Sequence, residues 1–384
     1  MPLLSPWPPL LCLLLALAAT SLLARRFPVH LPPGRISTLD GLRGYLAFAV
    51  FCHHAAIWAG VLRNIPWTEP PSNLYLQLGQ SSVALFFMIT AFLFTSRILR
   101  NPGEDWLRFY ISRILRLVPL YYLTVFAMFL IVAAGSHWTL RVRPASLASQ
   151  AATWLLFETS FLNDFDAPVV VAGATWTLAF EWVFYLSLPL LALLLRRPPP
   201  LAALLMPLIA AVYAFNLPYP AEKALPFAGG IVAAFLARRP AFSSLASHPG
   251  SAFLVIAPVA AVFTFPAVGS GLPRLALLTL AFSLIAAGNT LGGILSAPLS
   301  RIFGEFTYST YLIHGLLLFV TFRAFPALAR AATASPLAHW AIIASLTPIL
   351  ITAAFFSFRF IESPALRSAP ALTAWLRALP RRSA

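Results

Sequence analysis

Charged residues are scarce in this chain of 384 residues. Asp, Glu, Lys and Arg together make up 10% of it, while 60% is hydrophobic and the mean hydropathy is +0.84. This composition excludes an ordinary soluble globular domain. The sequence also lacks a long polar stretch that could form a separate soluble domain. It therefore predicts an all-α protein, a polytopic bundle of transmembrane helices.

Cysteine and lysine are nearly absent as well. The two cysteines, Cys12 and Cys52, lie inside apolar runs and match no disulfide or metal-binding pattern, so we expect no metal. Lys223 is the only lysine, so the net charge of +15 comes from arginine. The arginines gather at the ends of apolar runs, which is the pattern of cytoplasmic loops in membrane proteins. We therefore exclude nucleic acid as a partner.

Apolar runs and basic clusters together predict the topology. The clusters follow the first, third, fifth, seventh and ninth spans and fill the tail, so all lie on the cytoplasmic side if there are eleven spans. The N-terminus is then outside and the C-terminus inside. The expected spans lie near 8–24, 42–62, 80–98, 116–134, 175–195, 201–217, 224–238, 251–267, 273–289, 306–324 and 339–358.

Two segments leave this topology open. Residues 149–162 are apolar but short and contain Glu158, so we expect an interfacial or re-entrant helix in an external loop over 135–174. A full span there would reverse the side of every later cluster. The first run has no basic residue before it, which favours a retained anchor over a cleaved signal peptide, although Ala-Leu-Ala at 16–18 leaves cleavage possible.

The stretch 37–62 is the one around which the other motifs are arranged. It begins polar and then runs apolar, which predicts a transmembrane helix. Ser37 and Asp40 have the spacing of a capping box, so we expect the helix to begin near Ser37.

Arg43 and His54 are eleven residues apart on this helix, close to three full turns. Both side chains therefore share one face, about 16 Å apart along the axis, whereas His53 points elsewhere. One interpretation is a topology anchor and a packed histidine. The other is a functional site, because ionisable groups are costly inside a bilayer.

Four further motifs place ionisable side chains near the membrane. Arg113 and Arg116 share a helix face just before Pro119 and are either topology anchors or a clamp for anionic phosphates. Glu181 lies at about 21 Å from the inner side and His54 at about 18 Å, so a shared cavity is plausible. Tyr311 and His314 are at i, i+3 and share one helix face. Arg359 and Glu362 are expected to pair, and Pro364 just after them is expected to end the helix.

Six motifs in a fixed order resemble the acyltransferase-3 family of integral membrane O-acyltransferases. This group includes bacterial O-antigen and exopolysaccharide O-acetyltransferases, and the resemblance covers residues from about 37 to 367. The motifs are LDGLRG at 39–44 with His54 eleven residues after Arg43, SVALFFMITAFLF at 82–94, the Arg113/Arg116 pair, WTLAFEWVFYL at 176–186, YSTYLIH at 308–314 and FIESP at 360–364.

The resemblance implies transfer of an acyl group, usually acetyl, from cytoplasmic acyl-CoA to a hydroxyl of a cell-surface or lipid-linked carbohydrate. Acyl-CoA would be a donor substrate, with no permanently bound cofactor and with membrane lipids as surroundings. The catalytic candidates are His54, Glu181 and Arg43. The candidates for binding the CoA phosphates are Arg43, Arg113 and Arg116, and those for the substrate are Trp176, Tyr311 and His314.

His54 would act as general base or form an acyl-histidine intermediate. Glu181 would orient the histidine or bind the acceptor, and Tyr311 and His314 are candidates for stabilising the oxyanion. The chain departs from the family pattern at Thr177, where Ser is usual, and at Trp182, where a second Glu is common. A role that needs two carboxylates is therefore in doubt.

The expected organisation is an N-terminal transmembrane anchor and linker over 1–34, a membrane acyltransferase domain over 35–368 and a short basic cytoplasmic tail over 369–384. A transporter or proton-coupled carrier is the rival interpretation, because His and Glu within the membrane also form proton relays. Against it, the sequence shows no inverted hydropathy repeat and no paired broken helices. A scaffold without chemistry is a third possibility.

Overall fold

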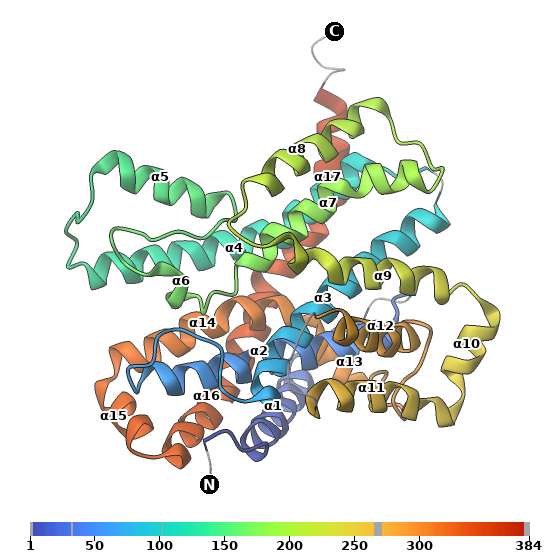
Figure 1. Ribbon diagram of the computed structural model, residues 1–384. Helices are drawn as coiled ribbons and strands as arrows, with labels where there is room; N and C mark the ends of the chain where they lie inside the picture. Colours follow the sequence, from blue (N-terminus) through green and yellow to red (C-terminus); the bar gives the residue numbers. More distant parts are fainter. Residues whose placement is uncertain (1–2, 32–33, 102, 265–270, 380–384) are drawn as a thin grey trace. The chain divides into compact units, whose positions relative to one another are not determined.

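The computed structural model describes residues 3–31, 34–101, 103–264 and 271–379. Over these residues the fold is helical, as predicted, and the only β pairing is an isolated bridge between Leu162 and Phe165 (Figure 1). The chain forms two compact units, each built from two separate segments. Unit 1 comprises Met1–Arg97 and Pro218–Thr352, and unit 2 comprises Ile98–Leu217 and Ala353–Ala384.

Among the described residues, six helical segments are long and apolar enough to cross a membrane, and two bent helix pairs raise the number to eight. Helix occupies the described part of each of the eleven segments expected from the sequence, with 265–267 lying outside the described residues, but several helices are too short for a simple crossing. For example, α9 (Leu225–Leu236) spans about 18 Å, whereas the hydrocarbon core is about 30 Å thick. The helix lengths therefore support a membrane bundle without confirming the count of eleven. The six segments that are long and apolar enough to cross a membrane are α1 (Trp7–Arg26), α2 (Ser37–Val61), α3 (Asn73–Arg100), α4 (Trp106–Gly135), α7 (Trp176–Leu194) and Pro336–Ala378.

Unit 1 is organised around α2, which is buried over most of its length. This helix packs against α13 (Pro298–Glu305) and α14 (Thr307–Ala324). A Cβ atom on Gly44 would lie 2.7 Å from the Phe303 side chain, so a small residue is needed for this close approach. Other helices of the unit are α10 (Pro240–Ser247), α11 (Ala252–Thr264), α12 (Leu272–Ala286), α15 (Pro326–Ala334) and α16 (Pro336–Ser357), with short turns η2 (Ala221–Ala224) and η3 (Pro249–Ser251).

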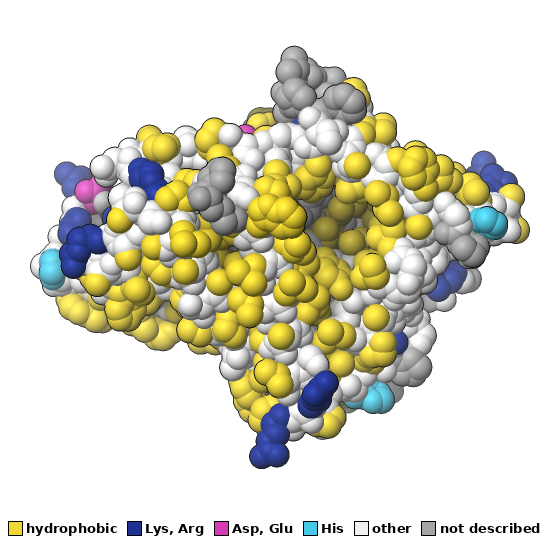
Figure 2. Space-filling view, turned by 90° about the horizontal axis from the view of Figure 1, so that it is seen from below, with side chains coloured by type: hydrophobic (Ala, Val, Ile, Leu, Met, Phe, Trp, Pro, Cys, Tyr) yellow, Lys and Arg dark blue, Asp and Glu magenta, His cyan; other side chains and the backbone are white. Residues whose placement is uncertain are grey.

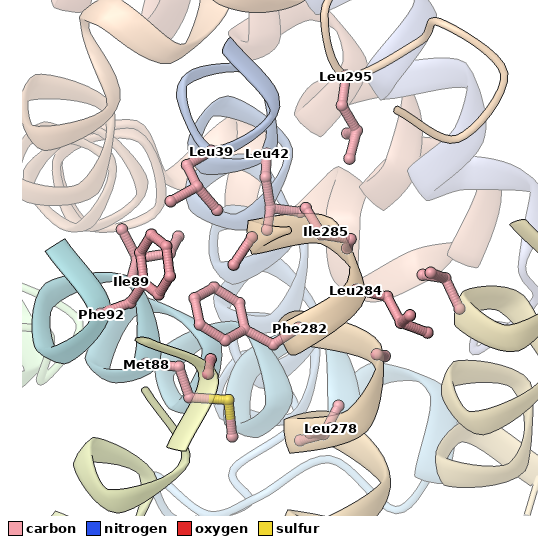
Figure 3. Packing of buried hydrophobic residues seen from close by; sticks show 14 of the residues in the cluster. Leu39, Leu42, Met88, Ile89, Phe92, Leu278, Phe282, Leu284, Ile285 and Leu295 are labelled. Carbon is pink, nitrogen blue, oxygen red and sulfur yellow. The ribbon is translucent and has the colours of Figure 1, made fainter. Parts of the chain in front are cut away.

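An apolar cluster joins α2, α3 and α12 within unit 1 (Figure 3). Leu39 and Leu42 come from α2, Phe92 from α3, and Phe282 and Ile285 from α12. The Thr38 hydroxyl donates a hydrogen bond of 2.9 Å to the Ile285 carbonyl oxygen at the same contact. This packing fixes the first turns of α2, and therefore the position of the arginine that follows.

Unit 2 contains α4 and α7, with α8 (Leu205–Phe215) beside α7 and α17 (Ser363–Ala378) against α4 (Figure 1). Asp105 caps α4 by accepting from the Arg108 backbone N–H, and Arg377 of α17 lies 2.6 Å from the same carboxylate. Desolvation alone would raise the pKa of Asp105, but these two partners outweigh it and lower the pKa below its ordinary value. The remaining elements are α5 (Pro144–Leu155), α6 (Ala167–Val170), η1 (Leu201–Leu204) and η4 (Phe358–Glu362).

Large apolar side chains remain exposed on many of the helices. Phe215 is 91% exposed and Leu201 84% exposed. Figure 2 shows one face of the molecule covered largely by hydrophobic side chains, with Lys and Arg gathered toward its edges. Contiguous apolar surface of this kind marks contact with lipid or with another protein. Together with the apolar spans, it indicates an integral membrane protein.

Three local predictions are wrong. The expected capping box does not form, because Ser37 is already helical, the N-cap is Ile36, and the Asp40 carboxylate instead accepts from arginines. Pro364 does not end its helix, since it occupies the first turn of α17, where a missing N–H costs nothing. The fourth span, expected to begin at 116, begins earlier, because α4 starts at Trp106 and carries both Arg113 and Arg116.

The region expected as an external loop contains a helix, as predicted, but at another position. Helix α5 covers Pro144–Leu155, whereas the apolar segment was expected at 149–162. With 12 residues it spans about 18 Å, less than the hydrocarbon core. The expected tail boundary at 368/369 falls inside α17.

Candidate functional site

Helix α2 runs without a break from Ser37 to Val61, so the spacing of Arg43 and His54 holds as expected for a regular helix. Eleven residues correspond to about 16 Å along the axis and to nearly three full turns. The helix therefore presents a cation near its N-terminus and an imidazole deeper on the same side.

Arg43 belongs to a network of four charged groups at the start of α2. Its guanidinium donates to Asp40, which also accepts from Arg35 over 2.8 Å. Arg35 in turn donates to Glu305 of α13 over 2.7 Å. Both carboxylates are largely buried, with 7% of each side chain exposed, and the two cations balance them. The network holds the Arg43 guanidinium in a fixed direction, with 18% of the side chain exposed.

His54 pairs with a second histidine that the sequence did not associate with it. Its Nδ1 atom lies 2.9 Å from Nε2 of His314, and the ring centroids are 5.0 Å apart. His314 is fully buried, and its Nδ1 lies 3.2 Å from the Thr310 carbonyl oxygen. The Tyr311 ring meets the His314 ring edge to face, with centroids 6.0 Å apart. Unit 1 therefore brings together three of the expected site residues, His54, His314 and Tyr311.

Trp67 adds a residue that sequence reasoning missed. Its ring stacks on His54, with centroids 6.0 Å apart and an interplanar angle of 26°. It lies in the segment between α2 and α3, where no helical periodicity signals a role. A half-buried aromatic ring beside an imidazole provides an apolar face that can cover a substrate.

His53 faces a different neighbour, as its position one residue earlier predicts. Its Nδ1 lies 2.7 Å from the Tyr75 carbonyl oxygen, and the side chain is buried. A Cβ atom added at Gly79 of α3 would lie 2.6 Å from the imidazole. The contacts of His53 are those of a packed residue between α2 and α3.

A second group of expected residues lies in unit 2. The Tyr185 hydroxyl donates to Oε1 of Glu181 over 2.6 Å, and the Arg113 guanidinium lies 5.9 Å from the Tyr185 ring centroid. The i, i+4 spacing of Glu181 and Tyr185 was the signal that could have identified Tyr185. Trp176 is the first residue of α7 and packs against Phe180, with ring centroids 5.7 Å apart.

Arg116 has a different partner from Arg113. Its guanidinium lies 3.3 Å from the Glu362 carboxylate, which is 1% exposed. The sequence predicted Arg359 as the partner of Glu362, because it is the near neighbour. The π-helical turn η4 brings Glu362 to α4, where Arg116 lies beside it, and the predicted pair of Arg359 with Glu362 stays a prediction.

The expected residues therefore fall into two groups. His54, His314, Tyr311 and Arg43 belong to unit 1, whereas Glu181, Arg113, Arg116 and Trp176 belong to unit 2. A cavity shared by His54 and Glu181 stays a prediction. Among the described residues, no group of three or more His, Cys, Asp or Glu side chains is arranged to hold a metal ion.

Comparison with known proteins gives one family. A sequence model of an acyltransferase domain, Acyl_transf_3, matches residues 36–358. "Nodulation protein 10" of Rhizobium leguminosarum bv. viciae is 28% identical over 43% of this chain and 46% of its own length. "Putative peptidoglycan O-acetyltransferase YrhL" of Bacillus subtilis (strain 168) is 28% identical over 40% of this chain and 23% of its own length. "Acyltransferase MdmB" of Streptomyces mycarofaciens is 26% identical over 74% of this chain and 79% of its own length.

The first two of these relatives are matched over less than half of their own length. No solved structure matches the chain.

Proposed function

Because the chain belongs to the acyltransferase-3 family, we propose that it is a membrane O-acyltransferase that transfers an acetyl group from cytoplasmic acetyl-CoA to a hydroxyl of a cell-surface or lipid-linked carbohydrate. The observation that carries this proposal is the arrangement along α2. A fixed guanidinium near one end and a paired imidazole about 16 Å deeper suit a long donor with phosphates at one end and a thioester at the other.

The proposed chemistry needs one base. Nε2 of His54 accepts the proton of the acceptor hydroxyl, and the hydroxyl oxygen attacks the thioester carbonyl carbon. A carbon–oxygen bond forms, the carbon–sulfur bond breaks, and the CoA thiolate takes the proton back from His54. The products are the acetyl ester and CoA-SH, and no other reactant is required. Transfer through an acyl-histidine at the same nitrogen is the alternative route.

The donor site is proposed from the arginines. The partly exposed Arg43 guanidinium would hold a CoA phosphate, with Arg113 and Arg116 as further candidates. Glu181, hydrogen-bonded by Tyr185, would bind the acceptor or orient the imidazole. Tyr311 beside His314, together with Trp176, would line the substrate site.

One relative's name favours acetyl as the acyl group and a carbohydrate as the acceptor. The Bacillus subtilis protein is named for O-acetylation of peptidoglycan, an envelope glycan. We propose a bacterial inner-membrane location, eleven spans, an external N-terminus and a cytoplasmic C-terminus. The basic clusters between the apolar segments support this orientation.

A proton-coupled carrier is the second candidate, and the paired histidines on apolar helices favour it, because such groups also relay protons. Purified protein in a lipid bilayer separates the two. The enzyme transfers label from acetyl-CoA to a glycan acceptor and produces CoA-SH, whereas the carrier moves protons across the bilayer without thioester cleavage. Mass spectrometry of surface glycans from cells with and without the gene identifies the acceptor.

A further inference from the structure

The hydrogen bonds of His314 determine which nitrogen carries its proton. A carbonyl oxygen only accepts hydrogen bonds, so the 3.2 Å contact with Thr310 requires a proton on Nδ1 of His314. In a neutral imidazole the other nitrogen, Nε2, is then an acceptor. That acceptor lies 2.9 Å from Nδ1 of His54.

The charge of His314 follows from its surroundings. The side chain is 0% exposed, and its hydrogen-bond and ring-contact partners include His54, Phe51, Tyr311 and the Thr310 carbonyl, with His53 nearby. None of them is acidic. A buried cation without an anionic partner is costly, so the neutral form is the one that this site accommodates.

The same reasoning then fixes the tautomer of His54. Because Nε2 of His314 accepts, Nδ1 of His54 must donate, and the lone pair of His54 is on Nε2. No described residue hydrogen-bonds to that Nε2, and His54 keeps some exposed surface whereas His314 has none.

We propose that His314 is a positioning residue, a neutral histidine that holds His54 in the tautomer whose free Nε2 lies on the substrate side. The order of groups is the Thr310 carbonyl, His314, His54 and then the acceptor hydroxyl. When Nε2 of His54 takes the hydroxyl proton, the imidazolium still donates from Nδ1 to His314, so the pair stays hydrogen-bonded through the reaction. The proposal rests on the proposed function for the hydroxyl step, and it replaces the expectation that His314 contacts substrate.

Nitrogen-15 NMR of the full chain, with labelled histidine and in lipid bilayers, tests the tautomer without any assay of activity. Comparison with His54→Gln assigns the His54 signals. The expected result is a proton on Nδ1 of His54 and a lone pair on Nε2 near neutral pH. A His54 protonated on Nε2 with its lone pair on Nδ1 would overturn the proposal.

Two substitutions at His314 separate positioning from packing. His314→Leu removes the acceptor, whereas the Oε1 atom of His314→Gln reaches roughly the place of Nε2 and still accepts from His54. We expect Leu to lower kcat by about 100-fold with the KM for acetyl-CoA unchanged, and Gln to recover to within about tenfold of the wild-type kcat. NMR should show mixed His54 tautomers in the Leu variant and the wild-type tautomer in the Gln variant.

His339 supplies the matched control. It is also a fully buried histidine bonded to α2, with Nε2 lying 3.0 Å from the Ala55 carbonyl oxygen, and it does not bond to His54. His339→Gln should leave the His54 tautomer unchanged. If His314→Leu keeps the wild-type kcat, or if Gln and Leu are equally inactive, the positioning role is wrong. If the wild-type protein shows the expected tautomer but transfers no acetyl group, the proposed function fails and the hydrogen-bond order stands.

Discussion

Nδ1 of His54 and Nε2 of His314 lie 2.9 Å apart, although 260 positions separate the two residues in the chain. Helix α2 supplies the first and α14 the second, and the two helices pack against each other within unit 1. The site therefore exists only after the early and late parts of the chain have come together. Local sequence spacing locates each histidine on its own helix, but it does not pair them.

Asp40 is expected to control the direction of Arg43. Asp40→Asn keeps the shape of the side chain but removes the charge shared by Arg43 and Arg35. If Arg43 binds a CoA phosphate, the KM for acetyl-CoA should rise by about three- to tenfold, because a charge-assisted hydrogen bond is lost. Steady-state kinetics measure this. Glu305→Gln is the matched control, because it touches Arg35 and not Arg43, and an unchanged KM in Asp40→Asn would contradict the donor role of Arg43.

Arg113 is expected to bind the donor through its planar guanidinium. Arg113→Ala should weaken acyl-CoA binding, and Arg113→Lys should not rescue it fully, because a point charge lacks the fork geometry. Binding of labelled acyl-CoA to membranes gives the affinity. Arg108→Ala, an exposed arginine on the same helix, is the control. If Arg113→Ala binds acyl-CoA with the wild-type affinity, Arg113 does not bind the donor and serves only as a topology anchor.

Arg116 is expected to affect stability more than Arg113 does. Arg116→Met removes one ion-pair partner of the Glu362 carboxylate, which is 1% exposed, and removing one partner of a buried pair costs about 3 kcal/mol. The unfolding temperature in detergent should therefore fall, and the double variant Arg116→Met with Glu362→Gln should regain most of the loss. A single variant as stable as the wild-type protein would show that the pair contributes nothing. Acyl-CoA affinity in the double variant then reports any direct role of Arg116.

The proposed topology predicts the side of two basic clusters. Reporter fusions placed after Arg197 and after Arg239 should both report the cytoplasm, because the clusters at these points follow the cytoplasmic charge pattern. A fusion within 103–105, in the short connection between α3 and α4 that Arg100 and Arg108 flank, serves as a cytoplasmic reference. An external signal at either test site would mean that the segment around α5 crosses the membrane.

The sequence predicted the features that depend on composition and local periodicity. Apolar runs identified the helical membrane fold, and the motif order identified the family that the later comparison confirmed. The separate direction of His53 also followed from local spacing, and α2 does start at Ser37, although the capping box that predicted this start does not form. These features need no knowledge of which helices meet.

Features that depend on tertiary contacts could not be predicted. Glu362 lies 3.3 Å from Arg116, which is far away in the sequence, because a π-helical turn brings Glu362 to α4. Arg35 pairs with Glu305, 270 positions away in the chain, because α13 packs on α2. The helix end at Pro364 was also misjudged, because this proline lies in the first turn of α17.

The most direct test of the central claim is acetyl transfer from labelled acetyl-CoA in membranes that carry His54→Ala or His53→Ala. The two variants remove adjacent histidines from one helix, and protein level and membrane insertion are measured for both. Nδ1 of His54 bonds to His314 and its Nε2 is left for the acceptor hydroxyl, whereas His53 bonds to the Tyr75 carbonyl oxygen. We therefore expect His54→Ala to abolish transfer and His53→Ala to retain most of it. An active His54→Ala enzyme would contradict the proposed mechanism.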